Sequence, residues 1–135
     1  MNKTVAIEWL EKAWHHFSSG KLLYEARHYT DTIGIDLHYA IEVMLKAFLA
    51  YENKKIIKTH DLLELQKHIK HFIKFDIEEK KLLGKISTYH IEASYPSKDR
   101  PMPTYEELKE VIDFGKELFS KICKLLDINE NEVKR

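Results

Sequence analysis

Apolar residues recur every three or four positions along most of the chain, which is the spacing of an amphipathic helix rather than of a strand. The first such stretch predicts a helix from near Thr4 to about Ala26. Its apolar positions are Ala6, Leu10, Ala13, Phe17 and Tyr24. A short turn over 27–31 separates it from a second helix, which the pattern predicts over about 32–52.

The predicted second helix is the most apolar part of the chain. One side carries Ile33, Leu37, Ala40, Ile41, Met44, Phe48 and Tyr51, and the opposite side carries Ile35, Tyr39, Val43 and Ala47. A helix that is apolar on most sides is either central in its domain or shared with a second chain. We therefore expect it at the centre of a bundle, and its surplus apolar surface favours a homodimer.

Two capping-box patterns mark the starts of later helices. Asp76 stands three residues before Glu79, and Thr104 stands three residues before Glu107. In such a box each side chain binds the backbone N–H of the other residue, which satisfies two groups that a helix start otherwise leaves unpaired. The sequence thus predicts a fourth helix and a last helix after these positions.

The remaining pattern completes an all-helical chain. A third helix is predicted to begin at 59–61 and to continue through Phe72. All three prolines fall in one loop, 94–103, and no stretch alternates with period two as a strand would. We expect an all-α fold, an antiparallel up-and-down bundle of about five helices, forming one domain over 1–126. The polar tail, 127–135, is expected to fray.

The charge balance narrows the classes of function. The chain of 135 residues carries 22 Lys and Arg against 22 Asp and Glu. A protein that coats nucleic acid non-specifically carries a large positive excess, so this balance argues against that role and leaves room only for a local basic patch. A hydrophobic content of 44% also excludes a disordered chain.

The single cysteine and the interrupted apolar stretches bear on where in the cell the protein is expected. Cys123 is the only cysteine, which fits a reducing environment. The first residues lack a signal-peptide pattern, and charged residues interrupt the longest apolar stretch, 35–51. We expect a cytoplasmic protein without a membrane segment.

The histidines raise the question of a metal site. His68 and His71 share a helix face with Glu64, a donor set that zinc accepts. Nearby lysines would repel a divalent cation, so we interpret this face as solvated surface and predict no metal and no cofactor. The glycine-rich loops and nucleophile motifs of common enzymes are absent from the sequence. Cys123 is expected to be a small buried apolar residue of the last helix.

Two features stand out for their polar residues. Glu42 lies four residues before Lys46 in the apolar second helix, the favourable order for a helical ion pair. The pair either stabilises the helix or lines a polar groove. The segment 89–100 gathers His, Glu, Lys, Arg and two Tyr at a helix end and in a constrained loop, where binding groups concentrate. The alternative is an ordinary surface loop.

In their order and spacing these residues resemble the HEPN domain family (higher eukaryotes and prokaryotes nucleotide-binding). The matching segments are Glu8-Trp9-Leu10-x-x-Ala13, Ala40-x-Glu42-x-x-Leu45-Lys46-Ala47, Thr59-His60-Asp61-Leu62 and Tyr95-Pro96, over about 8–126. The resemblance implies an antiparallel helical bundle that dimerises. It also implies a small prokaryotic protein that partners a minimal nucleotidyltransferase in a toxin–antitoxin pair, or a metal-independent ribonuclease.

One part of the family pattern is missing. The ribonucleases carry an Arg followed after four to six residues by a His, with Arg stabilising phosphorane charge and His moving a proton. Many relatives have Arg-Tyr-Pro where this chain has Ser94-Tyr95-Pro96. Neither Arg27 nor Arg100 is followed by His at the required spacing. We therefore assign no catalytic residue, and His90 is the one candidate for a replacement base.

Three hypotheses follow. The leading one is a homodimeric module that binds nucleotide or RNA and partners a nucleotidyltransferase, with tyrosine rings stacking on a base and cations meeting phosphate. Its expected binding residues are Glu42, Lys46, His90, Ser94, Tyr95, Lys98 and Arg100. The second is a ribonuclease toxin with a degenerate motif, and the third is a scaffold whose function is its dimer.

Overall fold

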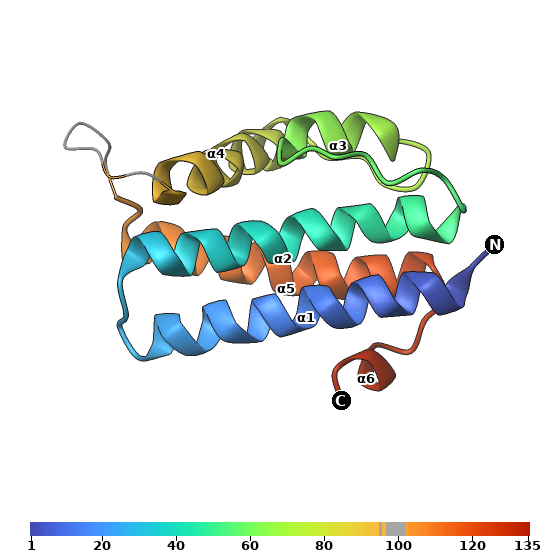
Figure 1. The fold of residues 1–135 in the computed structure, drawn as a ribbon, viewed down its shortest axis with the longest axis horizontal. Coiled ribbons are helices and arrows are strands. Elements are labelled where there is room, and N and C mark those ends of the chain that lie inside the picture. The colour runs from blue at the N-terminus through green and yellow to red at the C-terminus, as the bar shows by residue number, and fades with distance from the viewer. Residues whose placement is uncertain (95, 97–101) are drawn as a thin grey trace.

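The computed structural model describes residues 1–94, 96 and 102–135, and leaves the side chains of 91–94 undescribed. The described part contains helices and no strand, as the apolar spacing predicts. The helices are α1 (Lys3–Glu25), α2 (Thr30–Tyr51), α3 (Leu62–His68), α4 (Ile77–Ser94), α5 (Tyr105–Leu125) and α6 (Glu130–Val133). The chain is therefore an all-α bundle of antiparallel helices (Figure 1).

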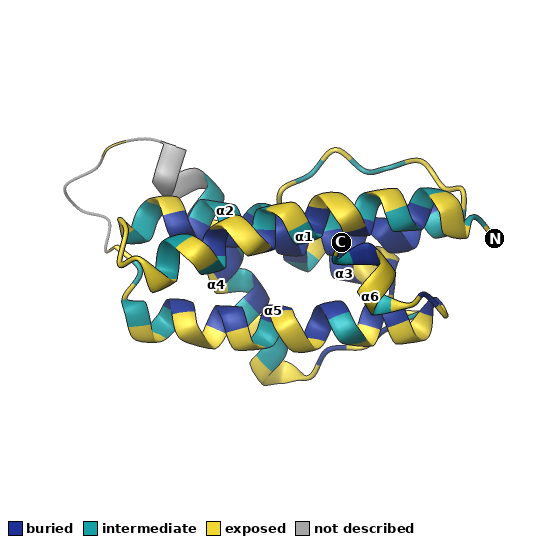
Figure 2. Cartoon of the chain, turned by 90° about the horizontal axis from the view of Figure 1, so that it is seen from below, coloured by how far each residue is buried: buried dark blue, intermediate teal, exposed yellow. Residues whose placement is uncertain are grey.

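Helix α2 lies in the middle of the bundle. It packs along α1 and also contacts α3, α4 and α5, so that α3 and α4 cover the face of α2 that α1 leaves open (Figure 1). Buried and exposed positions form separate stripes along the helices in Figure 2. The largest fully buried side chains include Phe17 of α1, Phe48 of α2 and Phe119 of α5.

The central place of α2 changes the argument for a dimer. Most of its apolar residues, from Ile33 to Ala50, are buried within one chain. The apolar surface of α2 therefore needs no second chain to cover it, and the surplus expected from the sequence is taken up by the neighbouring helices. Dimerisation stays a prediction that must rest on other surfaces.

Both predicted capping boxes mark helix starts, but only one is complete. The backbone N–H of Asp76 donates to the Glu79 carboxylate at 2.9 Å, and that of Glu79 donates back to Asp76 Oδ1 at 2.8 Å. At α5, Thr104 Oγ1 accepts from the Glu107 N–H at 3.0 Å. The Glu107 carboxylate instead accepts from the Tyr89 hydroxyl and pairs with Lys85 of α4 at 3.1 Å. It thereby ties α4 to the start of α5.

Two helix predictions are corrected. The third helix ends at His68, before the expected Phe72, and the chain then turns so that Ile73 and Phe75 also enter the core. The tail does not fray: it carries α6, and Val133 is 2% exposed against α1 and α5. Ile128 and Val133 are buried, and Ser120 of α5 donates to Glu130 at 2.8 Å. The tail is too short for a helical period to show in its sequence.

No helix in the described ranges is both long enough and apolar enough to cross a membrane.

Candidate functional site

Three polar side chains follow one another along the buried face of α2. His38, Glu42 and Lys46 are spaced four residues apart, so they lie one above another on the same side of the helix. Their exposed fractions are 0%, 5% and 7%, and Gln66 is the other buried polar residue among those described. Burying a charge is costly unless it is paired and hydrogen-bonded, so the partners of these side chains decide what the site can do.

The Glu42 carboxylate lies at the centre of the cluster. Its Oε1 contacts His38 Nε2 at 3.1 Å and His60 Nδ1 at 2.8 Å, and its Oε2 accepts from Lys46 Nζ at 3.0 Å. Burial alone would raise the pKa of Glu42, but its polar contacts with His38, His60 and Lys46 outweigh burial and lower the pKa to about 2. Glu42 is therefore ionised throughout the physiological range.

The His38 ring is held from both sides. Its Nδ1 lies 2.9 Å from the carbonyl oxygen of Ile86 on α4, and its Nε2 faces Glu42. A carbonyl oxygen can only accept, so Nδ1 carries the hydrogen of this contact. His38 thus joins α2 to α4 and aims its second nitrogen at the carboxylate.

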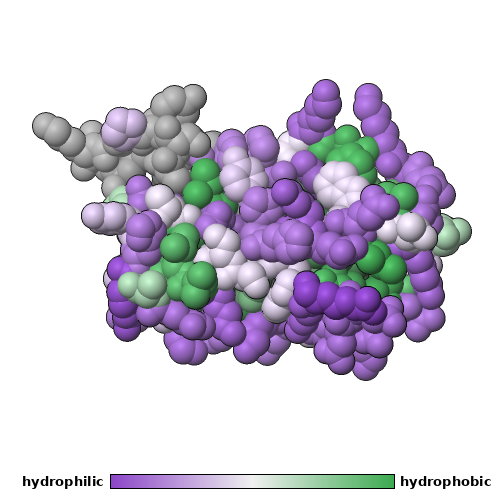
Figure 3. Space-filling model, turned by 60° about the horizontal axis from the view of Figure 1, so that its bottom comes forward, coloured by the Kyte–Doolittle hydropathy of each residue, from purple (hydrophilic) through white to green (hydrophobic). Residues whose placement is uncertain are grey.

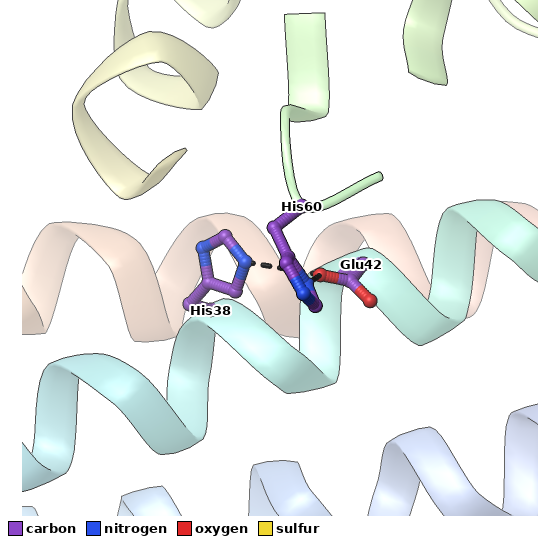
Figure 4. Close-up of side chains that lie close together, drawn as sticks. All are labelled: His38, Glu42 and His60. Carbon is purple, nitrogen blue, oxygen red and sulfur yellow. Dashed lines mark hydrogen bonds and ion pairs between the residues drawn. The ribbon is translucent and has the colours of Figure 1, made fainter. Parts of the chain in front are cut away.

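His60 reaches the cluster from the segment before α3 (Figure 4). Asp61 caps α3 by accepting from the Leu63 N–H at 2.9 Å, and the Leu62 N–H donates to Ser87 Oγ of α4 at 2.9 Å. These bonds attach the turn to α4 and bring the His60 ring over α2. The Thr-His-Asp-Leu segment therefore both starts a helix and positions a histidine.

His90 of α4 completes the group. Its ring stacks on that of His60, with centroids 3.9 Å apart and planes 19° from parallel. The pKa of His90 is lowered by burial and by the nearby His60 and His38, against the opposing charge of Glu42. The rings of Tyr39 and His90 are nearly perpendicular, with centroids 5.5 Å apart. The result is a set of imidazole rings that reaches from the buried carboxylate to a His60 side chain that is 53% exposed.

The Glu42–His60 contact has a recognised chemical use. A carboxylate that binds one ring nitrogen of a histidine fixes its tautomer and its orientation, and leaves the other nitrogen for proton transfer. Here Nδ1 of His60 donates to Glu42, so Nε2 is the atom left for a ligand. The same group of atoms can bind an anion through its imidazole donors, or a metal ion through its lone pairs.

The structure gathers some of the predicted binding residues and leaves the rest undescribed. Glu42 and Lys46 form the predicted ion pair, and the His90 ring lies 5.4 Å from that of His38 beside them. Ser94 is the last residue of α4, and its side chain lies outside the described residues. The predicted positions that also lie outside them are Tyr95, Lys98 and Arg100.

Sequence reasoning missed two members of the cluster. His38 precedes Glu42 by four residues, as Glu42 precedes Lys46, so the spacing on α2 was a signal for it. For His60, the sequence pattern at 59–61 indicates only a helix start. Its partner Glu42 stands 18 residues away, and no local spacing indicates that contact.

The other residues considered for chemistry do not assemble. Glu64 accepts from Thr59 Oγ1 at 3.0 Å and His71 binds Glu52 at 2.8 Å, so these two residues have separate partners. The expectation for Cys123 is confirmed, because the side chain is 1% exposed. Burial, with the nearby charge of Glu130, raises its pKa to about 11.

Comparison with known proteins identifies the family. The model of the HEPN domain matches residues 6–126, which is most of the chain. Searches of curated proteins and of solved structures gave no match. The matched region contains the whole of α1 to α5 apart from the first residues, including the cluster around Glu42. The chain therefore belongs to the HEPN domain family.

Proposed function

We propose that this HEPN-domain protein binds a nucleotide or an RNA end at the cluster of Glu42, His60 and His90. The observation that carries the proposal is the His60–His90 stack over a buried, ionised carboxylate. Flat rings at the surface can stack on a nucleobase, and imidazole N–H groups can donate to phosphate oxygens. In the sequence, α4 is followed by Tyr95, Lys98 and Arg100, the ring and cations that are also predicted to bind, which lie outside the described residues.

The charges around Glu42 support an anionic ligand. One carboxylate is surrounded by one lysine and three imidazole rings, and Lys46 alone already balances its charge. Any proton that the histidines gain when a ligand binds therefore adds positive charge that phosphate can use. A phosphate oxygen can accept from Nε2 of His60 once that nitrogen carries a proton, whereas the ammonium of Lys46 would repel a second cationic side chain.

A homodimer and a nucleotidyltransferase partner are parts of the same proposal. They are what the resemblance to the family implies, since many of its small prokaryotic members resemble partners of minimal nucleotidyltransferases in toxin–antitoxin pairs. The described surface offers separate apolar patches among polar residues on the face shown in Figure 3. Leu22 and Tyr29, at the corner between α1 and α2, are 67% and 72% exposed and are the first residues to test as dimer contacts.

The binding experiment uses fluorescently labelled nucleotides and short single-stranded RNA, added to protein that has been treated with a chelator. We expect saturable binding that weakens at least about tenfold in the double variant His60→Gln/His90→Gln, since two stacking rings are lost. His71→Gln is the matched control, because His71 also binds a glutamate at 2.8 Å but lies outside the cluster. Absence of binding, or equal loss in the control, would overturn the proposal.

The oligomer and the partner are tested separately. Sedimentation of the purified protein should give a dimer that Leu22→Ser/Tyr29→Ser weakens. Co-expression with the neighbouring genes should yield a nucleotidyltransferase that purifies with the chain. A protein that stays monomeric at all concentrations and purifies with no partner protein and no ligand would contradict both the proposed homodimer and the proposed nucleotidyltransferase partner.

The Glu42–His60 contact favours one further candidate, a metal-independent ribonuclease. His60, oriented by Glu42, would take the proton from a 2′-hydroxyl, and His90 would give one to the leaving oxygen. This reading predicts RNA cleavage in the presence of a chelator, which His60→Gln abolishes. RNA that stays intact after long incubation with purified protein would contradict it.

A further inference from the structure

One contact of His38 in the buried site has no hydrogen to join its two atoms. Its Nδ1 must donate to the Ile86 carbonyl, so in the neutral ring Nε2 carries a lone pair. That lone pair faces Oε1 of Glu42, which is an acceptor as well, at 3.1 Å. Two acceptors at this distance need a positive centre between them. Either a second proton on the His38 ring or a metal ion can supply it.

Three possible metal ligands converge on the same point. Nε2 of His38, a carboxylate oxygen of Glu42 and a ring nitrogen of His60 lie within 4.8 Å of one another. Zinc binds imidazole and carboxylate at about 2.0–2.2 Å, which places tetrahedral ligand atoms roughly 3.4 Å apart. The contacts of 3.1 and 2.8 Å at Oε1 are slightly shorter than this. Zinc binding would therefore require the three side chains to move apart by a few tenths of an ångström.

The surroundings orient these ligands as in a metal site. Histidine ligands donate their second ring N–H to a carbonyl or carboxylate, which is what His38 does with Ile86. Lys46 holds Oε2 of Glu42 and so leaves Oε1 as the one ligating oxygen. The positive charge of Lys46 opposes a cation, so the site will be weaker than one without a lysine.

We infer that His38, Glu42 and His60 form a zinc-binding site with two histidine ligands and one carboxylate ligand. Three protein ligands leave a fourth position for water, for His90 or for a ligand oxygen. The zinc ion would take the place of the proton between Glu42 and His60. It would also supply the positive charge between His38 Nε2 and Glu42 Oε1. This goes beyond the proposed binding of nucleotide, and departs from the sequence-based expectation of no metal, which rested on Glu64, His68 and His71.

The site is tested with Zn²⁺ alone, so that failure to bind zinc is distinguishable from failure to bind nucleotide. Chelator-treated protein is titrated with Zn²⁺ in a calorimeter, and with Co²⁺ in an absorption spectrometer. We expect one ion per chain and the visible bands of tetrahedral Co²⁺. His60→Gln should weaken the binding of both ions at least about tenfold, the scale of effects at ligated sites. His60 is the decisive variant because its ring is half exposed and its loss leaves the core intact.

His71→Gln is again the control. His71 lies 2.8 Å from Glu52, the same distance as His60 from Glu42, but no second histidine faces Glu52 in the described residues. The control should bind zinc as the unaltered protein does. Binding of no ion, a Co²⁺ spectrum without tetrahedral bands, or an affinity that His60→Gln leaves unchanged would overturn the inference.

Discussion

His60 and His90 stack face to face with centroids 3.9 Å apart, although they come from different elements of the chain. The stack forms because His60 is anchored below by Glu42, while the turn that carries it is bonded to Ser87 of α4. A stacked pair placed beside a buried carboxylate is more ordered than two surface histidines would be. This order is what makes the cluster a candidate site rather than a solvated patch.

Removing the charge of Glu42 should destabilise the fold strongly. In Glu42→Gln the ammonium of Lys46, whose side chain is 9% exposed, loses its counter-ion. Breaking a buried ion pair from one side costs about 3–5 kcal/mol. Urea denaturation followed by circular dichroism measures this loss. Glu52→Gln is the comparison, because its partners His71 and Lys54 are half exposed, and it should cost less than about 1 kcal/mol.

Lowering the pH should destabilise chelator-treated protein by protonating the Glu42 carboxylate. The folded-state pKa of Glu42, about 2, lies below the value of 4.5 of an unperturbed glutamate. The ionised carboxylate therefore stabilises the fold above about pH 5, and this contribution is lost as the pH falls toward 2. The loss is about 3 kcal/mol at most. Stability measured against pH should fall more steeply in this window for the unaltered protein than for Glu42→Gln, and equal slopes would contradict the assignment.

Two glycines should respond in opposite directions to the same substitution. A Cβ at Gly115 of α5 would lie 2.6 Å from the buried ring of Phe17, whereas at Gly84 of α4 the nearest atom is Leu63 Cδ1 at 3.4 Å. We expect Gly115→Ala to cost about 1–3 kcal/mol through overpacking. Gly84→Ala should gain up to about 1 kcal/mol from helix propensity. A gain in stability for Gly115→Ala in urea denaturation would show that the α1–α5 contact is looser than described, and a loss for Gly84→Ala would contradict the space described at that position.

Cys123 should be unreactive in the folded protein. Its side chain is 1% exposed, and burial together with the charge of Glu130 raises its pKa to about 11. Thiol reagents attack the thiolate, so at pH 8 a disulfide reagent should modify Cys123 far more slowly in the native protein than in urea. Equal rates would mean that α5 opens readily at this position.

The fold could be predicted from the sequence where the signals are local. The apolar stripe of α2 and the Asp76–Glu79 box depend on residues within a turn or two of one another. Helix C-termini were harder, because glycine is absent there. The residues Arg27, Asn53 and Asp127 take the left-handed conformation that glycine usually provides, with φ of 57°, 57° and 55°.

Of the contacts in the site, the sequence could predict only those made within one helix. The pair Glu42–Lys46 lies on one helix, and its spacing indicates the contact. The contact of His60 with Glu42 depends on how the segment after α2 folds back over it, and that path is set by tertiary bonds such as Leu62 N–H to Ser87. Sequence spacing carries no information about such a path. Residues that meet through it appear only once the helices are assembled.

The most direct test of the proposed site observes the histidine rings during ligand binding. The protein contains eight histidines, and NMR spectra of their ring protons, assigned with single His→Gln variants, follow each of them separately. Addition of a mononucleotide to chelator-treated protein should shift the signals of His60 and His90 saturably, with a smaller shift for buried His38, and should leave His71 unchanged. Signals of His60 and His90 that stay in place while the nucleotide is in excess would contradict the account.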